Sequence, residues 1–167
     1  NHGFGSVFIT NFTDEICRGG YNLKIFEISD REYTDKVLPS HFVLEDVAGI
    51  IVIELFDREY TKMLCNLGAP ILLVDSYTRA PSDLMQCDLV YMENYASSIT
   101  LASRMIEAGA KRIGFVGDID HCSSFMERWN GYRAALSNAD LPLDRNVCIM
   151  DADSEPYGEV DWIIKKM

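Results

Sequence analysis

Short, continuous apolar runs alternate along the chain with longer segments that have helical spacing. The short runs predict six strands: Asn22–Ile28, Gly49–Ile53, Pro70–Asp75, Asp88–Met92, Arg112–Val116 and Val147–Met150. The run Gly-Ile-Ile-Val-Ile has no polar position, which is typical of parallel strands that helices cover on both faces. This alternation predicts an α/β fold, built around parallel sheets.

The longer segments predict helices at Phe4–Arg18, Tyr33–Leu38, Asp57–Asn66, Tyr95–Ala108 and Phe125–Asn138, and a last one beginning near Pro156. In the first helix, large apolar residues recur at steps of four, so we expect this stripe to meet the sheet. Asn94 is a good N-cap for the helix that follows it. Gly109 is expected to end that helix.

The pattern also suggests how the chain divides. It opens on a helix with no strand before it and stops on a helix with no strand after it. Because α/β folds consist of whole strand–helix units, we expect a fragment that lacks strands at both ends. We place the hinge between two lobes near 88–94: residues 1–92 form a first lobe without its first strand, and residues 93–167 begin a truncated second lobe.

Composition indicates a packed protein that does not bind nucleic acid by itself. Apolar residues make up 48% and charged residues 25% of the 167 residues, which is close to globular averages. The net charge is −11, whereas phosphate backbones attract clustered cations. No apolar stretch approaches the roughly 20 residues that span a bilayer, and the first residues do not resemble a signal peptide. We therefore expect a soluble, cytoplasmic chain.

The cysteines give no sign of a disulfide framework or a zinc site. There are five, an odd number, and no two are spaced as C-x-x-C. We expect all of them to be free thiols that pack as small core residues in a reducing compartment. They are Cys17, Cys65, Cys87, Cys122 and Cys148.

Signatures of catalysis are absent. The chain contains no G-x-G-x-x-G, Walker loop, H-E-x-x-H or G-x-S-x-G. The segment Asp118-Ile-Asp120-His121 combines two carboxylates with an imidazole, but we favour a solvated loop over a metal site because no further ligand is positioned by the sequence. We therefore expect no enzymatic activity, cofactor or metal.

Asp75 is the first candidate for ligand binding. It ends the run Ile-Leu-Leu-Val-Asp and so is expected at the carboxyl edge of a parallel sheet, where open α/β folds bind ligands. Its carboxylate there could accept hydrogen bonds from hydroxyl groups of a ligand. The alternative is that Asp75 only caps the loop after the strand.

Arg128 is the second candidate. Ser124 and Glu127 fit an S-x-x-E capping box, which would place Arg128 near the first turn of its helix. A cation there is unfavourable by roughly 0.3–1 kcal/mol, so we expect the guanidinium to have a partner. That partner is either Asp118 or Asp120 in a structural ion pair, or a bound ligand.

Five segments together resemble the effector-binding core of the lactose-repressor/galactose-repressor family of bacterial transcription regulators. They are Val47-Ala-Gly-Ile-Ile-Val, Gly68-Ala-Pro-Ile-Leu-Leu-Val-Asp75, Asp88-Leu-Val-Tyr-Met-Glu-Asn94, Gly109-Ala-Lys-Arg-Ile-Gly-Phe-Val-Gly117 and Arg128-Trp-Asn-Gly-Tyr-Arg-Ala-Ala-Leu136. The resemblance covers roughly Gly20 to Leu141. It implies a periplasmic-binding-protein-like sensor of two doubly wound parallel-sheet lobes, both incomplete here. The family's usual aspartate before the third-strand glycine is replaced by Ala48.

The resemblance also implies a set of effector-binding residues. Arg128 matches the family's effector-binding arginine, and Ser124 lies one turn before it. Asp75 and Ser76 match the end of the fourth strand at the cleft. Phe4 falls in the segment that often lines the first-lobe wall; the ring that stacks on the ligand would come from Phe4, Tyr77 or a part outside this chain.

We therefore expect the ligand-sensing domain of a transcription regulator. The resemblance implies a sugar-like or nucleobase-like effector between the lobes, a homodimer, and DNA contact only through a helix-turn-helix outside this chain. One alternative is an extracytoplasmic sugar-binding protein of a transport system, against which the five scattered cysteines argue. Another is an α/β enzyme that uses Asp75 or the Asp118/Asp120 loop with a metal.

Overall fold

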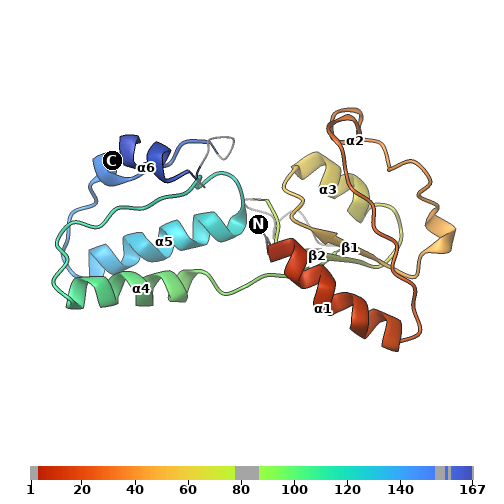
Figure 1. The fold of residues 1–167 in the computed structure, drawn as a ribbon, viewed down its shortest axis with the longest axis horizontal. Helices are drawn as coiled ribbons and strands as arrows, with labels where there is room; N and C mark the ends of the chain where they lie inside the picture. Colours follow the sequence, from red (N-terminus) through yellow and green to blue (C-terminus); the bar gives the residue numbers. More distant parts are fainter. Residues whose placement is uncertain (1–3, 78–86, 153–156, 158, 167) are drawn as a thin grey trace.

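The computed structural model of the chain describes residues 4–77, 87–152, 157 and 159–166. Two separate clusters of buried apolar residues organise it. We call the part around the first cluster, on the right in Figure 1, the first lobe, and the part around the second cluster the second lobe. The predicted boundary near 88–94 stays a prediction.

The first lobe contains a parallel sheet of three strands in the order β1-β2-β3. These are β1 (Ile50–Ile53), β2 (Ile71–Val74) and β3 (Asp88–Val90). Ile50 is paired with Ile71, and Leu72 with Asp88. All three strands were predicted, and the parallel α/β fold is confirmed. β2 is the most buried of the three because it lies between the other two.

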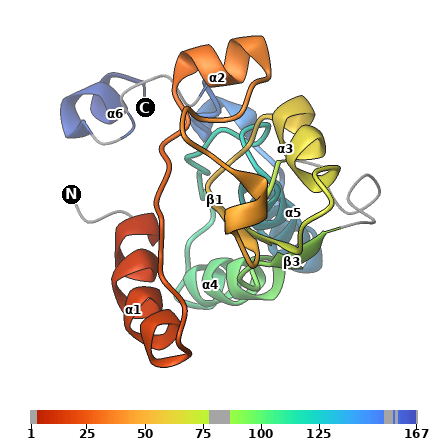
Figure 2. The ribbon, with the colours of Figure 1, turned by 90° about the vertical axis from the view of Figure 1, so that its right-hand side faces the viewer.

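Helices lie on both sides of this sheet (Figure 2). They are α1 (Phe4–Arg18), α2 (Asp30–Asp35) and α3 (Arg58–Cys65), with a 3-10 turn, η1, at Leu44–Asp46. The Asp57 side chain caps α3 by accepting a hydrogen bond from the Tyr60 amide. Tyr60 is fully buried, and its hydroxyl donates to the Val37 carbonyl at 2.8 Å. This face of α3 anchors the first-lobe core.

The prediction of a strand at Asn22–Ile28 is wrong. This segment carries no strand assignment, although it leaves α1 and leads to α2 as a strand would. The apolar stripe of α1 is only half-buried at Ile9, Phe12 and Ile16, so it does not meet the sheet as expected. Both departures have one physical reason: an apolar groove, lined by these α1 residues, Asn22–Ile28 and β1, separates them from the sheet.

In the second lobe, α4 (Tyr95–Glu107) packs along α5 (Ser123–Asn138) (Figure 1). A 3-10 turn, η3 (Arg145–Val147), and α6 (Val160–Lys166) follow. The core lies between the two long helices and the extended segments beside them. Its buried members are Ala102, Ile113, Trp129, Tyr132, Ala135 and Leu136.

Two further strand predictions hold only in part. Arg112–Val116 and Val147–Met150 are joined by a single parallel bridge, Val116 to Ile149, rather than by strands of a sheet. One helix is also shifted, since α2 starts at Asp30 instead of Tyr33. The described part of the last helix, α6, is Val160–Lys166, and its predicted start near Pro156 lies outside the described residues. A capping box explains the earlier start of α2, because the Glu32 carboxylate accepts a hydrogen bond from the Ser29 amide.

The prediction that all five cysteines are free is wrong. Cys65, at the end of α3, and Cys87, just before β3, form a disulfide. Sequence spacing gave no hint of it, because 22 positions separate the two residues. The other three are free thiols: Cys17 is exposed, Cys148 is half-buried and Cys122 is buried. Within the described residues, no helix has the length and apolar character to cross a membrane.

Gly131 sets the distance between α4 and α5. A Cβ atom at this position would lie 2.3 Å from the Tyr95 carbonyl oxygen and 2.9 Å from the Ser98 Cβ. We expect Gly131→Ala to destabilise the protein by at least about 1 kcal/mol, because overpacking against a backbone atom outweighs the helix propensity that alanine adds.

Urea unfolding measures this effect. Asn130→Ala is the matched control, since Asn130 is the exposed neighbour on the same helix. A Gly131→Ala protein as stable as the Asn130→Ala protein would show that the two helices are not in such close contact.

Candidate functional site

Asp75 stands at the carboxyl end of β2 in a backbone conformation that few residues adopt. Its φ is 64°, in the left-handed region that aspartate and asparagine tolerate better than other side chains. The Asp75 amide donates to the Val90 carbonyl at 2.9 Å, which continues the ladder towards β3. The Ser76 amide donates to Asp75 Oδ1 at 2.7 Å. The side chain is therefore held in one orientation at the sheet edge.

Three hydrogen bonds join this sheet edge to the start of α5 in the second lobe. Ser124 Oγ donates to Asp75 Oδ2 at 2.5 Å. The Ser123 amide donates to the Ser76 carbonyl at 3.0 Å, and Ser123 Oγ donates to the Tyr77 carbonyl at 2.6 Å. The structure thus brings Asp75, Ser76 and Ser124 together, although 49 positions separate Asp75 from Ser124.

Ser124 does not form the capping box that its spacing from Glu127 suggested. The helix begins at Ser123 and its N-cap position is Cys122, so Ser124 lies inside the first turn. Its hydroxyl has one proton, which goes to Asp75, so the Cys122 thiol, 3.2 Å away, is the donor in their contact. Burial raises the pKa of Cys122, which keeps this thiol protonated at neutral pH. A short chain of hydrogen bonds therefore runs from the Cys122 thiol through the Ser124 hydroxyl to the carboxylate of Asp75.

Arg128 lies one turn further along α5, and its hydrogen bond goes to a residue that was not among the predicted partners. Arg128 Nε donates to Asn94 Oδ1 at 2.9 Å. Its guanidinium carbon lies 5.4 Å from the centre of the Phe125 ring. In the described part of the chain, Arg128 forms neither an ion pair with Asp118 or Asp120 nor any hydrogen bond from its terminal nitrogens. Of the two partners expected for it, the structural ion pair is absent there.

Asn94 anchors this arginine from the segment that crosses between the lobes. It is 4% exposed, and its side-chain amide also donates to the Met92 carbonyl at 2.7 Å and to Glu127 Oε2 at 3.4 Å. Asn94 is at the N-cap position of α4, as predicted, but its side chain makes no capping bond. The sequence gives no signal that Asn94 binds Arg128, because capping already explains an asparagine before a helix.

Glu93 performs the capping that Asn94 was expected to provide. Its carboxylate accepts hydrogen bonds from the amides of Ala96 and Ser97, at 2.5 and 2.9 Å. These bonds hold the pKa of Glu93 below its usual range. Because Glu93 satisfies the helix terminus, the Asn94 side chain is left to bind Arg128.

A row of rings crosses the same junction. His121 lies 4.5 Å from Phe56, which follows β1, and 5.6 Å from Phe125 on α5, measured between ring centres. For the loop that contains His121, the sequence favours a solvated loop over a metal site. Among the residues that the structure describes, no group of three His, Cys, Asp or Glu side chains is placed to hold a metal ion.

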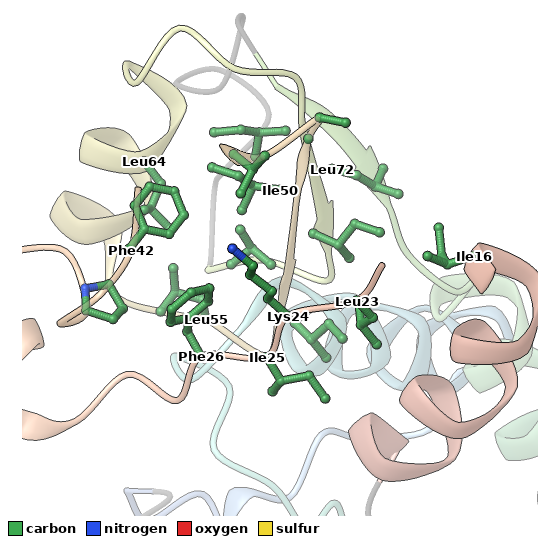
Figure 3. A pocket seen from close by; sticks show the side chains of 18 of the residues that line it. Ile16, Leu23, Lys24, Ile25, Phe26, Phe42, Ile50, Leu55, Leu64 and Leu72 are labelled. Carbon is green, nitrogen blue, oxygen red and sulfur yellow. The ribbon is translucent and has the colours of Figure 1, made fainter. Parts of the chain in front are cut away.

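The remaining predicted site residues are placed differently. The Ser76 side chain is buried and donates to the Tyr77 carbonyl at 3.3 Å, so its backbone carbonyl makes the contact with α5. Tyr77 belongs to the first-lobe core. Phe4 is the first residue of α1, and its side chain is outside the described part. A large groove of about 1360 Å³ lies elsewhere in the first lobe (Figure 3), and Asp75, Ser76, Ser124 and Arg128 are not among the described residues that line it.

Comparison with known proteins gives a match in structure only. No protein-family model matches the chain, and no curated protein matches it. Solved structures of transcription regulators do match. The regulator CcpA of Lactococcus lactis is 23% identical with a TM-score of 0.70, over 87% of this chain and 54% of that one.

Two other matches extend this picture. A protein described as a ribose operon repressor from Burkholderia thailandensis is 25% identical with a TM-score of 0.64, over 84% of this chain and 53% of its own. The regulator CelR, solved with cellobiose, is 24% identical with a TM-score of 0.55, over 64% of this chain and 32% of its own. The chain therefore has the fold of the sensor core of LacI (lactose-repressor) family regulators. It spans about half the length, or less, of these matches.

The buried position of Asn94 gives a prediction for the site. Asn94→Ala removes the acceptor of Arg128 Nε and the donor to the Met92 carbonyl. We expect the free energy of unfolding to fall by about 1–3 kcal/mol, the cost of leaving buried polar groups without partners.

Chemical denaturation measures this fall. Asn138→Ala, at the exposed end of α5, is the control and should change stability by less than about 0.5 kcal/mol. Equal stability of the two variants would contradict the anchoring role of Asn94.

Proposed function

We propose that this chain is the effector-binding core of a transcription regulator. In this proposal, a small polar effector, sugar-like or nucleobase-like, binds at the junction of the two lobes and controls DNA binding. The fold shared with LacI-family regulators supports the general assignment. The geometry of Arg128 supports the position of the site.

The arrangement of Arg128 is the observation that carries the proposal. Its guanidinium is fixed on one side by Asn94 and on one face by Phe125, yet its terminal nitrogens have no hydrogen-bond partner within the described residues. A planar fork held in this way can bind a carboxylate, a pair of hydroxyls or the polar edge of a ring with little loss of entropy. The guanidinium of Arg128 is therefore preorganised to bind a ligand.

Asp75 and Ser124 would link ligand binding to a change in the contact between the two lobes. Their hydrogen bond directly joins the two lobes. A ligand hydroxyl that takes the place of Ser124 on the Asp75 carboxylate removes one bond between the lobes and adds its own. The effector therefore binds open and closed arrangements with different affinity, which is the requirement for shifting a conformational equilibrium. Ser76 and Phe4 are the further contacts proposed for it.

The partners of the whole protein are proposals as well. A net charge of −11 disfavours direct contact of this piece with a phosphate backbone, so DNA binding would reside in a helix-turn-helix outside this sequence. The effector would change the spacing of two such heads in a homodimer. The proposed location is the cytoplasm, where the DNA is, and no chemical step or cofactor takes part.

One observation favours a second candidate function. The disulfide between Cys65 and Cys87 is the kind of bond that persists in oxidising compartments. It weakens the argument from scattered cysteines against an extracytoplasmic sugar-binding protein of a transport system. A two-lobed binding protein of that type would use the same junction.

Counting free thiols in the cell separates the two candidates. In the cytoplasmic regulator we expect the reducing compartment to open the disulfide between Cys65 and Cys87, so that rapid alkylation of denatured lysate labels all five cysteines of the chain. Mass spectrometry reads the number of labels. Three labels, on Cys17, Cys122 and Cys148, would support the extracytoplasmic candidate instead.

Truncating Arg128 tests the proposed site. Thermal-shift measurements on the full-length protein with a panel of mono- and disaccharides and purine bases first identify a binder. We expect Arg128→Ala to weaken its binding by about 1.5–3 kcal/mol, the range for hydrogen bonds to charged groups, which is roughly a 10–150-fold rise in Kd.

Calorimetry with this binder measures the rise. Arg133→Ala is the control, because Arg133 is an exposed arginine five residues further along the same helix and lies over Trp129. An unchanged Kd in Arg128→Ala removes this arginine from the site. A panel without any binder contradicts the proposed effector classes.

A further inference from the structure

The disulfide between Cys65 and Cys87 closes a covalent ring that contains the first-lobe half of the junction. The two cysteines are 22 positions apart, and β2 lies between them in the chain. The same stretch contains the three first-lobe residues that accept hydrogen bonds from α5, which are Asp75, Ser76 and Tyr77. The state of this one bond therefore determines how much freedom the chain has on the first-lobe side of the junction.

The same disulfide fastens β3 to the rest of the first lobe. Cys87 directly precedes β3, which has only three residues and is an edge strand of the described sheet. Cys65 ends α3 and is buried in the first-lobe core. A strand as short as β3 has few ladder hydrogen bonds, and such an element opens locally at low cost. We therefore expect the bond to α3 to provide much of what holds β3 in place.

β3 in turn holds the backbone of Asp75. The Val90 carbonyl, at the end of β3, accepts a hydrogen bond from the Asp75 amide at 2.9 Å. The φ of Asp75 is 64°, a conformation that persists only when surrounding contacts hold it. Its carboxylate accepts the hydroxyl of Ser124 from the second lobe. A continuous series of contacts thus runs from the disulfide through β3 and Asp75 to α5.

The two cysteines are also placed for reversible oxidation. Cys65 is 8% exposed, whereas Cys87 is half-buried. Oxidation favours the more accessible thiol of a pair, and the second thiol then resolves the product. Larger side chains, such as Tyr60 and Leu73, fill the first-lobe core, so we expect the lobe to stay folded when the disulfide opens.

We propose that Cys65 and Cys87 form a redox switch for the contact between the lobes. As a disulfide, the pair fixes β3 and holds Asp75 against Ser124. As two thiols, it releases β3 and loosens that contact. In a reducing compartment the two thiols are the resting state, and a hydroperoxide forms the disulfide. The consequence for effector affinity rests on the proposed function, whereas the switch itself does not.

The reaction balances with a hydroperoxide as oxidant and a dithiol as reductant. The Cys87 thiolate attacks the terminal oxygen of the hydroperoxide, the O–O bond breaks, and the other oxygen leaves as an alcohol with the proton that the thiol gave up. The Cys65 thiol then attacks the sulfenic sulfur of Cys87, the S–S bond forms, and water leaves. Two electrons pass from the sulfurs to the peroxide. A dithiol returns them by thiol–disulfide exchange and becomes a disulfide itself.

Counting free thiols in the purified, folded full-length protein tests this chemistry. After treatment with dithiothreitol, we expect alkylation to label all five cysteines of this chain. After one equivalent of hydrogen peroxide, we expect labels only on Cys17, Cys122 and Cys148, and a second treatment with dithiothreitol restores five. A pair that stays reduced in peroxide, or that dithiothreitol does not open, overturns the proposal.

Hydrogen–deuterium exchange at the Ser123 amide tests the coupling, because this amide donates to the Ser76 carbonyl across the junction. We expect it to exchange at least about tenfold faster in the reduced protein, whereas the amide of Leu136, in the second-lobe core, changes less than about twofold. Equal exchange of Ser123 in the two forms overturns the coupling. An equal acceleration of both amides also overturns it, since the disulfide would then stabilise the whole protein. No effector is present, so this result is independent of the effector site.

Two serine variants identify the thiols responsible. Cys87→Ser removes the half-buried partner, so we expect Ser123 to exchange at the fast rate in both dithiothreitol and peroxide. Cys17→Ser removes an exposed free thiol and is the matched control, which keeps the full response. Cys122 is next to Ser123, so a response to peroxide that persists in Cys87→Ser assigns the effect to Cys122 and contradicts the proposal.

Discussion

The contact between the carboxyl end of β2 and the first turn of α5 is the constraint on which the described site depends. Asp75 adopts a positive φ at the end of its strand, and this turns its carboxylate towards Ser124. The adjacent carbonyls of Ser76 and Tyr77 accept bonds from Ser123. Because these bonds join the two lobes, they place Arg128 and Phe125 of α5 beside the segment that carries Asn94. Without this contact, the residues proposed to bind an effector would belong to two separate surfaces.

Much of the fold could be predicted because its signals are local. The apolar runs of β1 and β2 and the helical spacing of α3 to α5 gave elements close to their observed bounds. Asn22–Ile28 contains four large apolar residues among polar ones, which is compatible with a strand, but strand formation also requires a neighbour with which to pair, and no single segment encodes that. The disulfide between Cys65 and Cys87 likewise depends on tertiary proximity. Local pattern therefore predicted the elements better than their pairing.

In the site, too, the sequence predicted which residues matter better than which partners their side chains contact. The need for a partner of Arg128 followed from helix electrostatics, yet Asn94 could not be identified, because its position before α4 is equally well explained by capping. The capping box predicted for Ser124 does not form, and the Ser124 hydroxyl instead donates to Asp75 across the junction. His121, in a segment predicted as a solvated loop rather than a metal site, packs between Phe56 and Phe125. Residue types at these positions were informative, whereas their partners came from the three-dimensional arrangement.

A double-mutant cycle on Asp75 and Ser124 is the most direct test that the two lobes meet through this pair. Asp75→Gly keeps a residue that tolerates positive φ, Ser124→Ala removes the hydroxyl, and urea unfolding of the full-length protein gives the four free energies. A shared hydrogen bond to a charged group predicts a coupling energy of about 1 kcal/mol or more. Additivity within about 0.3 kcal/mol would contradict the contact and the site built on it.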